Sequence, residues 1–211
     1  MVLREEFEAY AAECKCALRT VMARLENLRQ ETELSDTRTP FDSIEWRIKS
    51  FESVEEKCNR KCYDFTMESI KKNITDIAGI RVVTPFRDDI YTIEKAIIRQ
   101  PSMTVMERRD YVAKPKHNGY QSLHLIVFMD IYFMNTSKFI PVEIQLRDKA
   151  MDLWATLDHI IGYKNPNATP DNLEQFKSIS EILTDFDTKA MELRDYALGT
   201  PNPNDNMQQN S

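Results

Sequence analysis

The chain has 211 residues, of which 42% are hydrophobic and 29% are charged. That length and composition are typical of one ordinary globular domain that buries a real core. The net charge of −6 argues against non-specific nucleic-acid binding, which depends on Lys and Arg neutralising phosphates. Any phosphate-binding surface must therefore be a local basic patch on an acidic body.

Neither a membrane span nor a signal peptide is predicted. No window approaches 18 uninterrupted apolar residues, and residues 1–6 lack the apolar core of a signal peptide. We therefore expect a cytoplasmic protein with no membrane partner. The cysteines, Cys14, Cys16, Cys58 and Cys62, match no familiar zinc spacing, so reduced, partly buried thiols are expected. A redox role for the last two is the less favoured alternative.

Helical periodicity is strong at the N-terminus. Apolar residues recur at steps of three and four over residues 3–34 and predict one long amphipathic helix. Residues 35–40 form a break. A second helix is predicted from about Ser43 or further on, through Cys58, and a short helix follows over residues 66–72.

The middle and C-terminal parts alternate strand and helix patterns. Strands are predicted over residues 80–84, 103–108, 121–129 and 139–146, and helices over residues 86–100, 150–163 and 173–198. The fold class is therefore α/β (α+β), with a mixed sheet flanked by helices and a long helix at each end. The stretch 199–211, rich in Pro, Asn and Gln, is predicted to be disordered.

The spacing of apolar residues also predicts which faces of the last two helices are buried. For the helix over residues 150–163 these are Met151, Leu153, Trp154, Leu157, Ile160 and Ile161. For the helix over residues 173–198 they are Phe176, Ile179, Leu183, Phe186 and Ala190.

Two acidic residues are candidates for metal binding and catalysis. Asp76 lies just before a predicted strand, and Glu143 lies within the last one, where Glu143, Gln145 and Arg147 share one face. An acidic pair at neighbouring strand ends can hold Mg²⁺, which takes one or two carboxylates together with phosphate oxygens. A solvated surface acid is the default interpretation of either residue alone. The spacing of the two acids and the polar residues around them favour a metal site.

Basic residues gather around these acids. Residues 104–124 contain four Lys or Arg and two His but only two acids. Polyphosphates require such charges, although a solvated face is the default for each residue alone. Arg81 fits that default least, because it lies in an otherwise apolar strand, where its guanidinium can stack on a purine. The candidates are Arg47 and Lys49 on the predicted second helix, with Lys57, Arg81, Arg108, Arg109, Lys114, Lys116 and His124.

Tyr120 offers a flat surface for a nucleobase. In a strand that begins at Gly119, Tyr120, Ser122 and His124 share one face. The alternative is a tyrosine at the rim or in the core. His159, inside a predicted helix, is more typical of a capping or interhelix residue than of a catalyst.

Three separated segments, Thr75–Arg81, Lys116–His124 and Val142–Arg147, closely resemble the synthetase domain of the RelA/SpoT family. The match runs from about Phe41 to Lys164, and the chain length resembles that of the small alarmone synthetases. The resemblance implies a nucleotidyltransferase-like fold with about five strands. It also implies a GTP diphosphokinase of the stringent response, which moves the β,γ-pyrophosphate of ATP to the ribose 3′-hydroxyl of GTP, GDP or sometimes GMP, with Mg²⁺ as cofactor.

The resemblance assigns roles on the ATP side. Asp76 would coordinate Mg²⁺, and Glu143 would contact the metal or take the proton from the 3′-hydroxyl. Arg47 and Arg81 look like the pair that sandwiches adenine. Lys49 and Lys57 look like contacts to the ATP phosphates.

Further residues are implied on the acceptor side. Tyr120 looks like the residue that stacks on guanine, while Arg109, Lys116 and His124 would hold the acceptor phosphates. Gln145 and Arg147 would line the same floor. Asp152 stands where some relatives have an Asn that recognises guanine, and its carboxylate can still accept hydrogen bonds from guanine N1 and N2.

The implied organisation has four parts: an N-terminal oligomerisation helix (1–38), a synthetase domain (39–166), a C-terminal helix (167–198) and a tail (199–211). A homotetramer built through the terminal helices is expected by resemblance. No hydrolase motif and no TGS or ACT region is found, so the enzyme should only synthesise. Ser43 stands where some relatives place an aromatic residue near a regulatory site, so regulation by pppGpp or single-stranded RNA stays open.

Two alternatives remain. A relative of this type can pyrophosphorylate tRNA 3′ ends or make adenine alarmones, and the acidic balance argues weakly against tRNA. A non-enzymatic nucleotide- or RNA-binding regulator would be expected to lack an acid or a phosphate-binding cation, yet Asp76, Glu143, Arg81 and Tyr120 are all present. The order of preference among GTP, GDP and GMP is left open.

Overall fold

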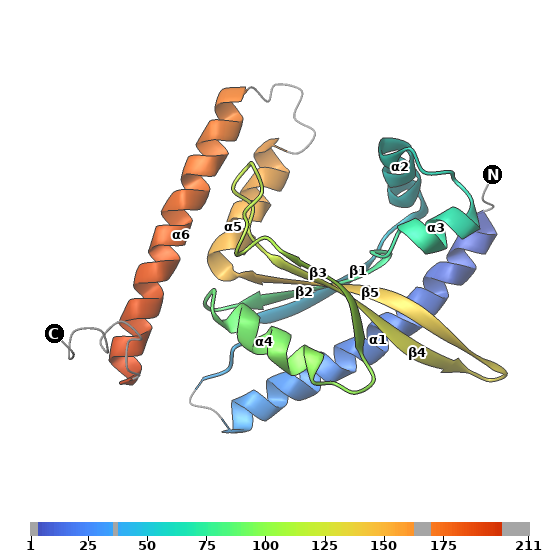
Figure 1. The fold of residues 1–211 in the computed structure, drawn as a ribbon, viewed down its shortest axis with the longest axis horizontal. Helices are drawn as coiled ribbons and strands as arrows, with labels where there is room; N and C mark the ends of the chain where they lie inside the picture. The colour runs from blue at the N-terminus through green and yellow to red at the C-terminus, as the bar shows by residue number, and fades with distance from the viewer. Residues whose placement is uncertain (1–3, 36–37, 163–169, 200–211) are drawn as a thin grey trace.

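A computed structural model describes residues 4–35, 38–162 and 170–199, and it contains a five-stranded mixed sheet with helices on both faces (Figure 1). The strand order is β1-β2-β5-β4-β3, and β2 and β5 are parallel while the other neighbours are antiparallel. The strands are β1 (Ser43–Ile48), β2 (Ala78–Thr84), β3 (Thr104–Asp110), β4 (Leu123–Phe133) and β5 (Thr136–Asp148). The expected α+β class and mixed sheet are confirmed.

Helices connect and cover these strands. They are α1 (Arg4–Ser35), α2 (Phe51–Lys61), α3 (Met67–Asn73), α4 (Asp89–Ile98), α5 (Lys149–Leu157), a single π-helical segment η1 (Asp158–Gly162), and α6 (Pro170–Leu198). Figure 1 shows α1 and α4 below the sheet, α2 and α3 above it at the right, α5 above it at the left, and α6 running past its left end from above to below. The helices predicted over residues 3–34, 66–72 and 86–100 are confirmed within a few residues.

The apolar stripe of α1 packs against the sheet of its own chain. Phe7, Leu18, Val21 and Leu25 on this helix are fully buried in the same core as Ile144 of β5. Burying one large aliphatic side chain contributes about 1.5–3 kcal/mol, so this stripe is a main source of stability. The stripe therefore lies within the protomer's own core.

The second predicted helix begins later than expected, because residues 43–48 form strand β1 instead. Within this segment Ile44, Trp46 and Ile48 alternate with polar residues, and β1 pairs antiparallel with β2. Helix α2 starts only after Ser50, whose hydroxyl caps it by accepting a hydrogen bond from the amide of Ser53. Arg47 and Lys49 thus lie on a strand and in the following loop.

The buried faces predicted for the last two helices are only partly correct. Met151, Trp154 and Phe176 form a second small core, and the Trp154 indole donates to the Phe176 carbonyl oxygen at 2.8 Å. The predicted core residues Leu157 and Leu183 pack against this small core partly buried, and the face that α6 turns to the body also buries the polar residues Ser180 and Asp187. Because Ser180 and Asp187 take the inner face of α6, the predicted core residues Ile179 and Phe186 of that helix are exposed. Leu153, Ile160 and Ile161, on α5 and η1, are exposed as well.

Three smaller findings complete the fold. All four cysteines are free, with Cys14 and Cys58 buried and Cys62 exposed. Among the helices that the structure describes, none combines the length and the apolar character needed to cross a membrane. The predicted disorder of residues 199–211 falls, apart from Gly199, outside the described residues.

Candidate active site

The face of the sheet opposite α1 carries a polar row that crosses all five strands. Residues paired in register on neighbouring strands lie side by side on one face. The pairings place Arg109 beside His124, His124 beside Gln145, Gln145 beside Arg81, and Arg81 beside Glu45. The predicted alternation of β5 is therefore confirmed, with Gln145 on the polar face.

Gly79 opens a pocket in the next row. It pairs with Arg47 on one side and with Glu143 on the other. A Cβ atom added at Gly79 would meet no atom nearer than 4.0 Å, so the absent side chain leaves open space above the strand. The resulting small pocket of about 130 Å³ is lined by Glu45, Trp46, Arg47, Asp76, Gly79, Ile80, Arg81, Glu143 and Gln145.

The Glu143 carboxylate is buried and held at both oxygens. His124 Nδ1 lies 3.0 Å from Oε1, and Gln145 Nε2 donates to Oε2 at 2.8 Å. Burial raises the pKa of Glu143, but the bonds from His124 and Gln145 outweigh it and hold the pKa below its usual range. Glu143 is therefore ionised at neutral pH.

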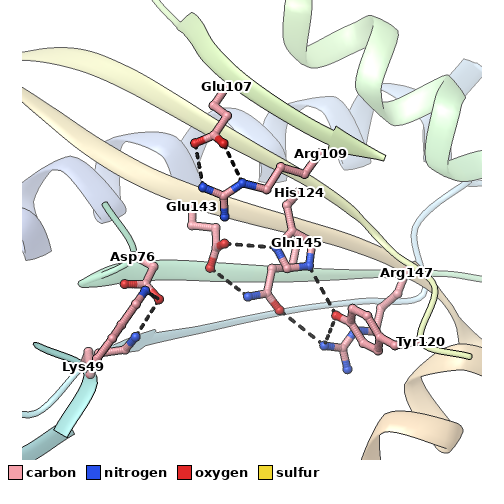
Figure 2. Close-up of polar contacts among 10 residues, drawn as sticks. Lys49, Asp76, Glu107, Arg109, Tyr120, His124, Glu143, Gln145 and Arg147 are labelled. Atoms are coloured by element: carbon pink, nitrogen blue, oxygen red, sulfur yellow. Dashed lines mark hydrogen bonds and ion pairs between the residues drawn. The ribbon is translucent and has the colours of Figure 1, made fainter. Parts of the chain in front are cut away.

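Tyr120 and Arg147 close these contacts into a ring of five side chains (Figure 2). Arg147 Nη2 donates to the Tyr120 hydroxyl at 3.0 Å and to Gln145 Oε1 at 3.3 Å. The Tyr120 hydroxyl lies 3.3 Å from His124 Nε2. Since the Glu143 carboxylate can only accept, His124 Nδ1 carries the hydrogen of that contact, and Nε2 faces the Tyr120 hydroxyl.

Asp76 lies at the opposite side of the small pocket, where two lysines hold it. Lys49 and Lys57 both donate from Nζ to Asp76 Oδ2, at 2.6 and 2.8 Å. Burial raises the pKa of Asp76, and the two ammonium groups outweigh burial and lower it. Asp76 Oδ1 is buried and has no hydrogen-bond partner among the described residues.

Two larger clefts adjoin the small pocket, since Arg47 lines all three. The first, here called the tyrosine cleft, has a volume of about 500 Å³ and is lined by Arg47, Arg81, Tyr120, Gln145, Arg147, Ala155, Thr156, Asp158, His159 and Ile160. The second, the lysine cleft, has a volume of about 660 Å³ and is lined by Arg47, Ile48, Lys49, Ser50, Ser53, Glu56, Lys57, Arg60 and His159. Four cations and one acid in the lysine cleft favour a polyanionic ligand.

The ring of Tyr120 is flanked by two cations. Lys116 Nζ lies 4.7 Å from the ring centroid, and Arg147 Cζ lies 5.4 Å from it. Lys116 is an exposed residue and Arg147 is buried. Lys116 is thus the more accessible of the two cations beside the ring.

Other predicted residues are brought to the same face but are paired within the protein. Arg109 forms two hydrogen bonds to Glu107, at 2.6 and 2.7 Å. Asp152 lies 3.1 Å from Arg147 and 3.5 Å from Arg81. In contrast, Arg108 binds the buried carboxylate of Glu94 on α4, so its role is structural.

Sequence reasoning missed Arg60 and interpreted His159 as a capping or interhelix residue. Arg60 lines the lysine cleft and could have been found, because it follows Lys57 by three residues on one helix face. His159 lines both large clefts from η1, a π-helical turn of the kind often found at functional sites. Helical periodicity alone favoured the structural interpretation of His159, because it does not show that the helix end borders a cleft.

The site also limits which metal it can hold. Among residues 4–35, 38–162 and 170–199, no three His, Cys, Asp or Glu side chains gather as a metal cluster. The acids that line the small pocket are Glu45, Asp76 and Glu143, and the last two are close enough for the charge of Asp76 to raise the pKa of Glu143. Two carboxylates suit a hard cation that shares its coordination sphere with phosphate oxygens.

A mixed sheet that presents buried acids beside adjoining clefts lined by Lys and Arg is typical of a transferase domain for nucleotide polyphosphates. The model of the region found in RelA / SpoT proteins matches residues 46–168. The GTP pyrophosphokinases YwaC and YjbM of Bacillus subtilis (strain 168) are 35% and 30% identical to this chain, over 85% and 90% of its length and 86% and 89% of theirs. The chain therefore belongs to the RelA/SpoT family.

The fold agrees with solved structures of the same family. The small alarmone synthetase 1 of Bacillus subtilis, bound to its product pppGpp, superposes with a TM-score of 0.83 at 30% identity. The match covers 90% of this chain and 97% of that one. The resemblance carried by the three sequence motifs thus extends to almost the whole fold.

Proposed function

We propose that this face of the sheet carries out (p)ppGpp synthesis as a GTP diphosphokinase. The enzyme transfers the β,γ-pyrophosphate of ATP to the ribose 3′-hydroxyl of GTP or GDP and releases AMP. The observation that carries the proposal is an ionised, buried Glu143 that faces a pocket bounded by Asp76 and cations. Two relatives named GTP pyrophosphokinase, aligned over most of their length, support the same activity.

ATP is assigned to the small pocket and the lysine cleft. Arg47 and Arg81 line the small pocket beside the open space at Gly79, where planar guanidinium groups can stack on adenine. Lys49 and Lys57 line the adjoining cleft, and phosphate binding is the role proposed for them. Both lysines must then share their hydrogen bonds between Asp76 and phosphate oxygens.

GTP or GDP is assigned to the tyrosine cleft, where Tyr120 supplies a stacking surface. Gln145 and Arg147 form the floor of that cleft, and Asp152 contacts Arg147 near its edge. Lys116 and Arg109 carry the positive charge proposed to hold the acceptor phosphates. His124 is less available for this role, because both of its ring nitrogens already contact protein groups.

Mg²⁺ is the metal proposed for the site. Asp76 Oδ1 is buried without a hydrogen-bond partner among the described residues, as expected of an oxygen reserved for a cation. Glu143 faces the same pocket and supplies the second carboxylate. When bound, the ion neutralises charge on the transferred phosphates and orients them.

Glu143 is the proposed general base. A carboxylate that faces the acceptor ribose can take the proton of the 3′-hydroxyl as that oxygen attacks the β-phosphate of ATP, with AMP as the leaving group. The surrounding Lys and Arg side chains stabilise the charge that spreads over the phosphoryl oxygens. Catalysis then rests on positioning and charge, without a covalent intermediate.

A nucleotide separation tests the function. Purified protein is incubated with γ-labelled ATP, Mg²⁺ and one acceptor, which is GTP, GDP, GMP or deacylated tRNA in parallel reactions. Labelled ppGpp or pppGpp with an equal amount of AMP is expected, and a parallel reaction with EDTA should give neither. Label on tRNA alone would replace the proposal with tRNA modification, and no transfer to any acceptor would refute it.

ATP and GTP as substrates also favour a cytoplasmic location.

A second copy of the chain is the partner proposed for α6. Ile182, Phe186 and Leu193 are 65%, 64% and 68% exposed, and their spacing places them along one helix face. Such an apolar stripe marks an interaction surface, and a homotetramer is the proposed assembly. The double substitution Ile182→Glu and Phe186→Glu should lower the sedimentation mass relative to the parent chain. A monomeric parent at micromolar concentration would refute the proposal.

A further inference from the structure

The Tyr120 hydroxyl has a position that stacking alone does not require. Stacking uses the face of the aromatic ring, and phenylalanine would supply it equally well. The hydroxyl instead lies between Arg147 Nη2, which donates to it at 3.0 Å, and His124 Nε2, 3.3 Å away. The Tyr120 hydroxyl therefore links Arg147, which lines the tyrosine cleft, to His124 at the buried side of the site.

The chain of contacts from this hydroxyl ends at Glu143. An imidazole can turn over about its bond to Cβ, and only one orientation places Nδ1 within 3.0 Å of Glu143 Oε1. A hydrogen bond to Nε2 selects that orientation. The Tyr120 hydroxyl thus acts on the Glu143 carboxylate through His124.

Arg147 fixes the other carboxylate oxygen by a second route. It donates to Gln145 Oε1 at 3.3 Å, and that contact orients the amide so that Gln145 Nε2 faces Glu143 Oε2 at 2.8 Å. The two routes start from one guanidinium and meet at one carboxylate (Figure 2). Because Arg147 and Glu143 are each only 6% exposed, water competes little with these bonds.

We infer that Tyr120 is a positioning residue for the reaction, whose hydroxyl orients Glu143 through His124 while its ring face contacts the acceptor base. The inference rests on the proposed function. It adds a link between occupancy of the tyrosine cleft and the orientation of Glu143, the proposed general base. A nucleobase that stacks on Tyr120 restricts the ring and so steadies the hydroxyl. Acceptor binding and catalytic geometry are then coupled through one side chain.

Tyr120→Phe separates the two roles, because it keeps the ring face and removes the hydroxyl. The expected result is a kcat lower by about 3- to 10-fold, the rate equivalent of one neutral hydrogen bond, with KM and the Kd for GDP unchanged. Tyr120→Leu removes the face as well and should also raise KM. Tyr132→Phe is the matched control, because Tyr132 is exposed at the far end of β4.

A double-mutant cycle then tests the route through His124. His124→Asn keeps a donor near the position of Nδ1 and removes Nε2. In this background Tyr120→Phe should cause no further loss of kcat, because the route is already broken. Additive losses would overturn the route, and a Tyr120→Phe enzyme with full kcat would overturn the positioning role. A parent chain that transfers no pyrophosphate would instead refute the proposed function.

Discussion

The hydroxyl of Ser180 on α6 donates a 2.6 Å hydrogen bond to the carbonyl oxygen of Gly119. Gly119 directly precedes Tyr120, and the neighbouring Gln121 donates to Thr184 of α6 at 2.8 Å. The loop that places the tyrosine ring is therefore clamped by a helix about sixty residues further along the chain. Changes in α6 are expected to reach the tyrosine cleft through this contact.

Gly119→Ala should disturb that clamp. Gly119 has a φ of +88°, and a Cβ atom added there would lie 2.6 Å from Ser180 Cβ. The left-handed backbone costs a non-glycine residue about 1–2 kcal/mol, and the clash adds to it. We expect a lower Tm in thermal unfolding and a KM for GDP that is several-fold higher.

Ser180→Gly provides the matched background for that change. Without the Ser180 side chain the two shortest contacts are gone, while the backbone strain and a 3.3 Å contact with Lys177 Cα remain. Gly119→Ala should therefore cost less stability there than in the parent chain. Equal costs in both backgrounds would show that contact with α6 does not limit the loop.

Asp187 should make the docking of α6 depend on pH. Burial and the nearby charge of Asp148 raise the pKa of Asp187 to about 6, against an opposing effect of Arg87, while an unfolded Asp has a pKa of about 3.9. The folded chain thus holds this proton more tightly than the unfolded chain. The contribution of Asp187 to the free energy of unfolding is fully present below pH ~4. It is lost as the pH rises through ~6, by at most about 3 kcal/mol.

Asp187→Asn should remove this dependence. The variant is expected to have a higher free energy of unfolding than the parent at pH 8 and a flatter profile between pH 4 and 7, as measured by urea denaturation. Asp185→Asn, which alters an exposed carboxylate paired with Lys189, should leave the profile unchanged. A parent-like slope in Asp187→Asn would contradict the assignment.

Glu143→Gln should abolish transfer and leave the fold intact. The amide has the same size and can remain bonded within the ring, but it has neither the charge nor the basicity of the carboxylate. Transfer should fall by about 10²-fold or more, with cooperative unfolding preserved. Glu33→Gln on α1, which alters an exposed pair with Arg29, should keep parent activity. Near-normal turnover in Glu143→Gln would refute the proposed base.

Gly79→Val should fill the small pocket without harming the fold. Space above Gly79 is open, and a β-branched residue suits a strand better than glycine. We therefore expect an unchanged or higher Tm together with a KM for ATP raised by about tenfold or more, the effect of losing a stacking surface. A lower Tm with an unchanged KM would show that the pocket does not receive adenine.

Local patterns predicted what local geometry determines. The alternation of Glu143, Gln145 and Arg147 with apolar neighbours placed them on one face of a strand, because side chains alternate with a period of two. The apolar stripe of α1 likewise predicted its buried side. Residues 43–48 were mispredicted because the helical spacing of Val54 and Cys58 was extended backwards past Ser50, where the cap begins the helix.

The sequence by itself determined the class of fold, the polar strand faces and the motifs shared with the RelA/SpoT family, since all three depend on neighbouring residues. Only the tertiary structure decided that Lys49 and Lys57 both hold Asp76, and that Tyr120, His124 and Arg147 meet around Glu143. It also buried the polar residues Ser180 and Asp187 of α6 and left Ile179 and Phe186 exposed. These contacts join segments far apart in the chain, and the order of the strands in the sheet sets the distances between the side chains.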